Sequence, residues 1–149
     1  MRLSAGADVN QATTDDGSTP LLTASAEGHG DVAAALVWAG ANVNQTKDDG
    51  ATPLYAASQE GHMNVVAVLV SADANVNQAQ TDDGATPLYV ASQEGHTDVV
   101  AAFVSAGADV NQARDDGARP LHAASTQGHT ELLVFLCRPE QTLIIVVTE

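Results

Sequence analysis

The chain has 149 residues, which is the usual length of one compact domain. Its 19 Asp and Glu residues outnumber five Lys and Arg residues and give a net charge of −14, so we expect no binding to nucleic acid and no electrostatic attachment to an anionic membrane. Apolar residues make up 44% of the sequence and aromatic residues only 3%, which predicts a folded core built from Ala, Val and Leu.

Four short motifs recur along the chain in the same order: Asp-Asp-Gly, Pro-Leu, Gly-His and Val-Asn-Gln. Gly-His lies at 28–29, 61–62, 95–96 and 128–129, which gives steps of 33, 34 and 33 residues. The one-residue variation falls between Gln and Asp-Asp, which predicts an exposed loop tip there. Repeats of this length are typical of stacked, solenoid-like folds.

Each copy predicts two short helices followed by a turn-rich link. In the second copy, Thr52 is a good N-cap and Pro53 suits the first helical position, so a helix begins there and ends at Gly61. A second helix follows, with apolar residues at helical spacing. Those residues are Val65, Val66, Leu69 and Ala72. Helices this short cannot bury their apolar sides alone, so we expect the copies to stack.

The recurring motif Asp-Gly-Ala-Thr-Pro-Leu-Tyr-x-Ala-Ser-x-x-Gly-His, followed by Val-Val and Ala-Gly-Ala-x-Val-Asn, resembles the ankyrin repeat. The resemblance extends from about Ser4 to Leu136. It implies an all-α solenoid in which each unit has a β-turn finger and two antiparallel helices. It also implies that a concave face of fingers and first helices binds other proteins, with no catalytic activity.

We therefore predict a single ankyrin-repeat domain over residues 1–149. It divides into a partial repeat at 1–14, full repeats at 15–47, 48–81, 82–114 and 115–138, and an irregular tail at 139–149. Neither end resembles the polar capping repeat of a solenoid, so we interpret the chain as a fragment of a longer array.

Three positions depart from the family pattern. Arg119 replaces the threonine that precedes Pro-Leu in the other copies, and loss of this N-cap should cost about 1 kcal/mol. His122 alone keeps the histidine that follows Pro-Leu in the family. Asp73 stands where Gly40 and Gly107 close the second helix, and Asp adopts the left-handed backbone less readily than glycine.

An Asp-Asp pair lies at the tip of each predicted finger. Two interpretations can coexist: the pairs form an acidic stripe that attracts a basic partner segment, or Asp before Gly makes the turn and keeps the tip soluble. Layers about 8–10 Å apart would let a partner interact with several pairs together, because the screening length is about 8 Å. The pairs are Asp15 and Asp16, Asp48 and Asp49, Asp82 and Asp83, and Asp115 and Asp116.

The resemblance adds contact candidates after each Asp-Asp-Gly and at the end of each first helix; the alternative is an ordinary solvated helix surface. These candidates are Ser18, Ala51, Ala85, Ala118, Glu27, Gln59, Glu60, Gln93, Glu94 and Gln127. With the finger Asp residues they form an edge that holds 11 of the 19 acidic residues and three basic ones, a net charge of −8.

Four histidines, His29, His62, His96 and His129, recur one layer apart. Layers about 8–10 Å apart are too distant to share a zinc ion, whose Zn–N bonds are about 2.0–2.1 Å. We expect each histidine to begin a helix and bond to a neighbouring loop, and we expect no metal and no cofactor. Trp38 is either a contact anchor or an ordinary half-exposed residue. Cys137 lies in an apolar helix, where a thiol is unreactive.

We expect a non-enzymatic protein–protein interaction scaffold that binds its partner on the acidic concave face, as a monomer. Every polar motif occurs four times in equivalent surroundings, whereas catalysis needs one place where unlike groups converge, so we predict no catalytic residues. The alternative is a passive spacer or targeting segment of a larger multidomain protein. A single cysteine favours a reducing, intracellular location, and we expect the cytoplasm.

Overall fold

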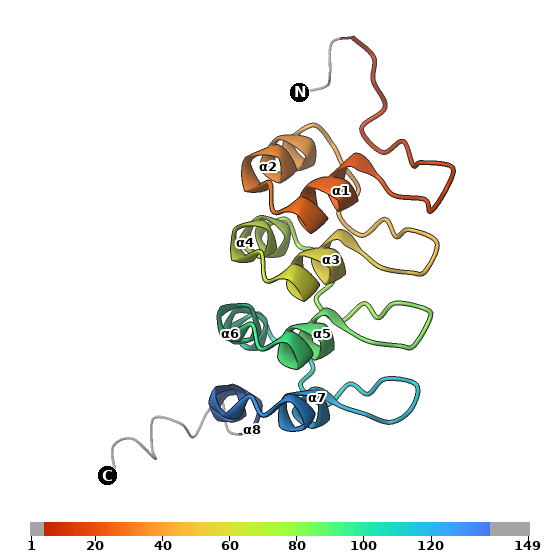
Figure 1. The fold of residues 1–149 in the computed structure, drawn as a ribbon. Coiled ribbons are helices and arrows are strands. Elements are labelled where there is room, and N and C mark those ends of the chain that lie inside the picture. The colour runs from red at the N-terminus through yellow and green to blue at the C-terminus, as the bar shows by residue number, and fades with distance from the viewer. Residues whose placement is uncertain (1–4, 138–149) are drawn as a thin grey trace.

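The computed structural model describes residues 5–137 and arranges them as four stacked helix pairs (Figure 1). The inner helices, each of which follows a finger, are α1 (Pro20–Glu27), α3 (Pro53–Glu60), α5 (Pro87–Glu94) and α7 (Pro120–Gln127). The outer helices are α2 (Gly30–Trp38), α4 (Met63–Ser71), α6 (Thr97–Ser105) and α8 (Leu133–Cys137), and the 3₁₀ turn η1 (Thr130–Leu132) precedes α8. Residues 5–137 contain no strand, and the predicted all-α solenoid is confirmed. The predicted tail at 139–149 lies outside the described residues.

The inner helices form one column and the outer helices a second, and the fingers project from the inner column away from the outer one (Figure 1). Each inner helix contacts the next inner helix, and α2, α4, α6 and α8 contact one another in the same sequence. The fingers and inner helices therefore share one side of the molecule, which we call the finger–helix face. Each helix pair falls within one predicted repeat, although the boundaries between repeats stay a prediction.

The inner helices begin as predicted. Thr52 Oγ1 accepts a hydrogen bond from the Tyr55 N–H at 3.0 Å, and Thr19 and Thr86 cap α1 and α5 in the same way. Arg119 makes no such bond at the start of α7, because a guanidinium has no acceptor. His122 Nδ1 instead accepts the Arg119 N–H at 3.0 Å.

The helix ends also follow the predicted chemistry. Gly61 closes α3 with φ of 75°, and a Cβ placed there would lie 2.5 Å from His96 Nδ1, so both the backbone and the packing require glycine. Asp73, after α4, has φ of 63° and is the sole non-glycine residue with positive φ in the described part of the chain. The outer helix itself ends two residues earlier, at Ser71.

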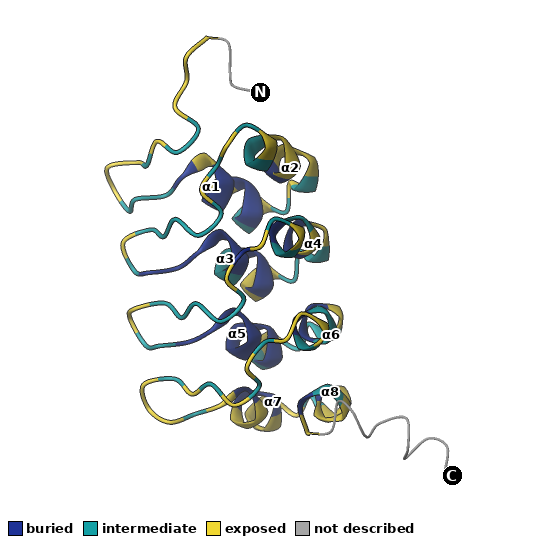
Figure 2. Cartoon of the chain, turned by 180° about the vertical axis from the view of Figure 1, so that it is seen from behind, coloured by how far each residue is buried: buried dark blue, intermediate teal, exposed yellow. Residues whose placement is uncertain are grey.

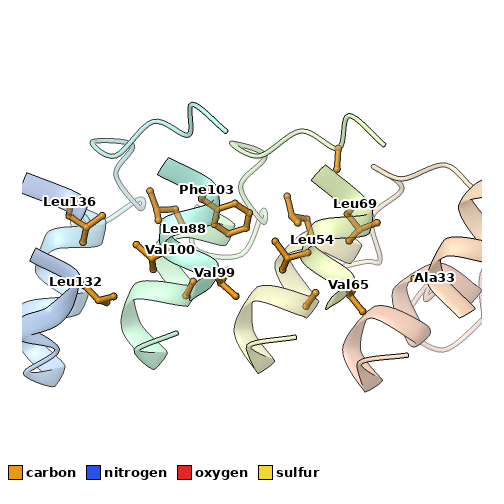
Figure 3. Packing of buried hydrophobic residues seen from close by; sticks show 14 of the residues in the cluster. Ala33, Leu54, Val65, Leu69, Leu88, Val99, Val100, Phe103, Leu132 and Leu136 are labelled. Atoms are coloured by element: carbon orange, nitrogen blue, oxygen red, sulfur yellow. The ribbon is translucent and has the colours of Figure 1, made fainter. Parts of the chain in front are cut away.

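One apolar core runs through the whole stack (Figure 3). Val65, Val66 and Leu69 of α4 are fully buried, as their spacing predicts, whereas Ala72 lies just beyond the helix and is half-buried. The same cluster continues through Leu88 in α5 to Leu136 in α8. Figure 2 shows the most extensive burial along α5, which has an inner helix on both sides.

Histidine side chains join each repeat to the one before it. His62 Nε2 lies 3.1 Å from the Ala26 carbonyl oxygen, and His96 and His129 make the equivalent bonds to Gln59 and Gln93 at 3.0 and 3.1 Å. Since a carbonyl only accepts, each Nε2 carries a proton and donates. The three histidines precede helices and bond to the preceding repeat, but the expected loop acceptor is wrong: the carbonyls belong to the last turns of α1, α3 and α5.

Main-chain bonds join consecutive fingers as well. The Asp48 N–H donates to the Asp16 carbonyl at 2.8 Å, and the Asp115 N–H donates to the Asp83 carbonyl at 2.8 Å. Between the second and third fingers the donor is the Thr81 N–H, which bonds to the Asp49 carbonyl at 2.9 Å. The third finger is one residue longer than the second, and it holds the extra residue at its exposed tip as predicted.

Candidate protein-binding face

The first aspartate of each Asp-Asp pair is an exposed residue. These residues are Asp15, Asp48, Asp82 and Asp115, and all four are exposed. Within residues 5–137 none of them takes part in an ion pair. They therefore leave four uncompensated negative charges along the finger tips.

The second aspartate of each pair builds the turn. Asp49 Oδ1 accepts the Ala51 N–H at 2.9 Å, and Asp16, Asp83 and Asp116 accept the N–H two residues ahead at 2.9 to 3.0 Å. This is the side-chain-to-backbone bond by which aspartate favours turns. The turn-forming interpretation is confirmed for the second aspartate of each pair.

Two basic residues lie among these turn-forming carboxylates. Lys47 Nζ is 3.9 Å from both Asp16 Oδ2 and Asp49 Oδ2, and Arg114 contacts Asp83 at 3.9 Å and also bonds to Asp116. The hydrogen bond from Arg114, followed by the Ala118 N–H, lowers the pKa of Asp116 from its ordinary 3.8 to about 2. Each cation therefore bridges its own finger to the preceding one.

Two of the predicted contact residues are not accessible. Ala51 is 4% exposed and Ala85 is 2% exposed, while Ser18 and Ala118 are half-buried. The residue at this position is therefore closed off from solvent in the second and third fingers and partly open in the first and fourth. Ala51 and Ala85 therefore present no side-chain surface to a partner.

A tyrosine pair, which we did not predict as part of the site, lies beside these alanines. Tyr89 belongs to a small buried cluster with Ala85 and Ala123, and Tyr55 and Ala118 pack against it. The Arg114 guanidinium carbon lies 4.9 Å from the centre of the Tyr89 ring, which is a cation–π contact. The available sequence signal was the aromatic residue that follows Pro-Leu in two copies.

The ends of the inner helices complete the face. Glu27, Glu60 and Glu94 end α1, α3 and α5 and are exposed, and none of them forms an ion pair in the part of the chain that the structure describes. Gln59 and Gln127 are exposed and Gln93 is half-buried. The acidic side chains of the helix ends thus extend the negative charge of the finger tips onto the inner helices.

The remaining candidates lie elsewhere. Trp38 is 66% exposed at the end of the outer helix α2, where it borders a shallow apolar hollow with Val37 and Val68. Cys137 ends α8 and is exposed, so the apolar helix does not bury this thiol, and its low reactivity stays a prediction. Among residues 5–137, no three His, Cys, Asp or Glu side chains come together in a way that would hold a metal ion, and no helix is long and apolar enough to cross a bilayer.

Comparison with known proteins agrees with this architecture. A family model described as ankyrin repeats (3 copies) matches residues 1–80 and 72–145. No curated protein matches the chain. Ankyrin repeats are generally protein–protein interaction modules and typically have no enzymatic activity. The family model covers nearly the whole chain and the four helix pairs reproduce its repeating unit, so this chain belongs to the ankyrin repeat family.

Proposed function

We propose that the protein is a non-enzymatic scaffold that binds a basic segment of a protein partner on its finger–helix face. The observation that carries this proposal is the uncompensated charge of that face. Seven exposed carboxylates lie on it without an ion pair in residues 5–137: Asp15, Asp48, Asp82, Asp115, Glu27, Glu60 and Glu94.

Repetition places one of these charges at the tip of each finger. Main-chain hydrogen bonds tie consecutive fingers together, although the longer third finger places Asp82 one residue beyond the position that Asp48 and Asp115 occupy. An extended basic segment laid across the fingers would meet one exposed carboxylate at each layer. Because such charges sit in solvent, they would act mainly on the association rate and on the choice of partner.

Two other functions are weighed against this one. A passive spacer or targeting segment would need no uncompensated charge at its finger tips, and the recurrence of one exposed carboxylate at each finger favours binding. An enzyme would need unlike groups that converge once, and the finger groups of this chain recur in every repeat. That the protein acts as a monomer, and in the cytoplasm, stays a prediction.

The test uses a twelve-residue peptide, four repeats of Gly-Ser-Arg, titrated into the full chain by isothermal calorimetry at 50 and 300 mM NaCl. The face variant carries Asp48→Asn, Glu60→Gln, Asp82→Asn and Glu94→Gln. The control removes the same number of charges elsewhere, with Asp31→Asn, Asp73→Asn, Asp98→Asn and Glu131→Gln.

We expect the face variant to lose about tenfold or more in affinity at low salt, and the control to lose less than about threefold. Higher salt should lower the peptide affinity of the unaltered chain towards that of the face variant, because salt screens the same charges that the variant removes. Binding that ignores salt, or equal losses in the two variants, would contradict the proposal.

A further inference from the structure

Three fingers present different residues at one structurally equivalent position. The N–H groups of Lys47, Gln80 and Arg114 donate to the carbonyl oxygens of Ala51, Ala85 and Ala118 at 3.0, 2.9 and 2.7 Å. This shared bond establishes that the three residues occupy the same place at the base of their fingers. The second and fourth fingers therefore place a cation where the third finger has an uncharged glutamine.

At two of the three steps between fingers, a cation lies between the carboxylates of consecutive fingers, and at one step it does not. Lys47 lies between Asp16 and Asp49, and Arg114 lies between Asp83 and Asp116. By the same register Gln80 falls between Asp49 and Asp83. Among the described residues Lys47 pairs with Asp49 and Arg114 with Asp83, but no single cation contacts both carboxylates. At this one step, two carboxylates follow each other without the cation that separates them elsewhere.

An aromatic ring lies at the same step. Tyr55 in α3 and Tyr89 in α5 occupy equivalent positions, three residues after the capping threonine. Arg114 covers the Tyr89 ring, and Tyr89 is only 6% exposed. The finger that follows Tyr55 carries Gln80 in place of this cation, and Tyr55 keeps a half-buried side chain. The chain thus contains one filled copy of the arrangement and one open copy.

The electrostatics of Tyr55 agree with this placement. Burial, followed by the negative charges of Asp83 and Asp49, raises the pKa of Tyr55 to about 12. The positive charge of Arg114 lowers this pKa and so opposes the two carboxylates, whose effect is the larger. Each carboxylate already accepts a backbone N–H through Oδ1 and has a cation 3.9 Å from Oδ2, Lys47 at Asp49 and Arg114 at Asp83. A carboxylate has about four acceptor sites, so each can still accept from another donor.

We propose that Tyr55, Asp49 and Asp83 form a slot for one arginine side chain of the partner, which takes over Tyr55 the position that Arg114 takes over Tyr89. This inference rests on the proposed function and adds to it the single anchoring contact. The slot prefers arginine to lysine, because a planar guanidinium stacks on the ring while its N–H fork bonds to carboxylates.

The test fills the slot from within the chain. Gln80→Arg repeats at the third finger what Arg114 does at the fourth, and should weaken binding of the arginine peptide described above about tenfold at 50 mM NaCl. Ser105→Arg, on the exposed end of α6, changes the net charge equally and should weaken it less than about twofold. A third variant, Tyr55→Leu, removes the ring without changing the charge, and leucine already occupies this position at Leu22.

The unaltered chain should bind the arginine peptide about fivefold more tightly than the same peptide with lysine, and Tyr55→Leu should abolish that preference. Equal weakening by Gln80→Arg and Ser105→Arg, or an arginine preference that survives Tyr55→Leu, would overturn the slot and leave the acidic-face proposal standing. Failure of the unaltered chain to bind the peptide at low salt would overturn the acidic-face proposal itself, and the slot with it.

Discussion

The two middle repeats bury residues that the first and fourth repeats expose. Val65 in α4 is fully buried, whereas Val32, at the same position in α2, is 50% exposed. Leu88 in α5 is 1% exposed and Leu121, its counterpart in α7, is 40% exposed. The residue types and their register are identical, so the difference comes from the neighbouring repeat. Burial in this molecule is a property of the contact between repeats, and each unit alone provides little of it.

The largest expected effect comes from shortening one side chain to alanine at equivalent positions of a middle repeat and an end repeat. Leu88→Ala should destabilise the protein by about 2–5 kcal/mol, since it leaves a cavity in a closed interface. Leu121→Ala should cost no more than about 1 kcal/mol, because much of that side chain already contacts water. Urea denaturation followed by circular dichroism measures both, and equal losses would contradict the difference between middle and end repeats.

A smaller effect is expected at the helix starts. Thr86→Ala should lower the free energy of unfolding by about 1 kcal/mol, because it removes the bond from the Tyr89 N–H. Arg119→Thr should raise it by a similar amount, because it supplies the cap that α7 lacks. Thermal denaturation of the two variants tests the pair. An unchanged midpoint for Arg119→Thr would show that the bond from the Arg119 N–H to His122 already replaces the missing cap.

The smallest effect concerns the fourth finger, whose tip is exposed and whose Asp116 is bonded to Arg114. Because the Asp116 pKa is lowered in the folded protein, its stabilising effect is complete above about pH 4 and is lost as the pH falls through about 2. The Ala118 amide resonance, which reports the bond to Asp116, should titrate with a midpoint near pH 2.

Two variants check that assignment. Arg114→Gln should move the Ala118 midpoint upward towards the ordinary aspartate value of 3.8, since it removes the largest cause of the shift. Asp116→Asn should abolish the titration. A midpoint that stays near pH 2 in Arg114→Gln would assign the shift to the backbone bonds instead.

Sequence chemistry was sufficient for features set within a few residues. Thr-Pro at a helix start and glycine at its end act locally, and four copies in register removed the ambiguity of any single one. The bridging by Lys47 and Arg114 and the burial of Ala51 were not predictable in this way. They depend on how one finger lies against the next, more than 30 residues away in sequence, which local propensity does not determine.

The joint between repeats has a consequence for how such a chain can grow. Each histidine bond unites a ring from one repeat with a main-chain carbonyl from the preceding one, and each finger bond unites two main-chain groups. Every unit of about 33 residues therefore carries both a donor face and an acceptor face of the same joint. A tandem duplication of one unit would be compatible with its neighbours at once, without a compensating substitution on either side.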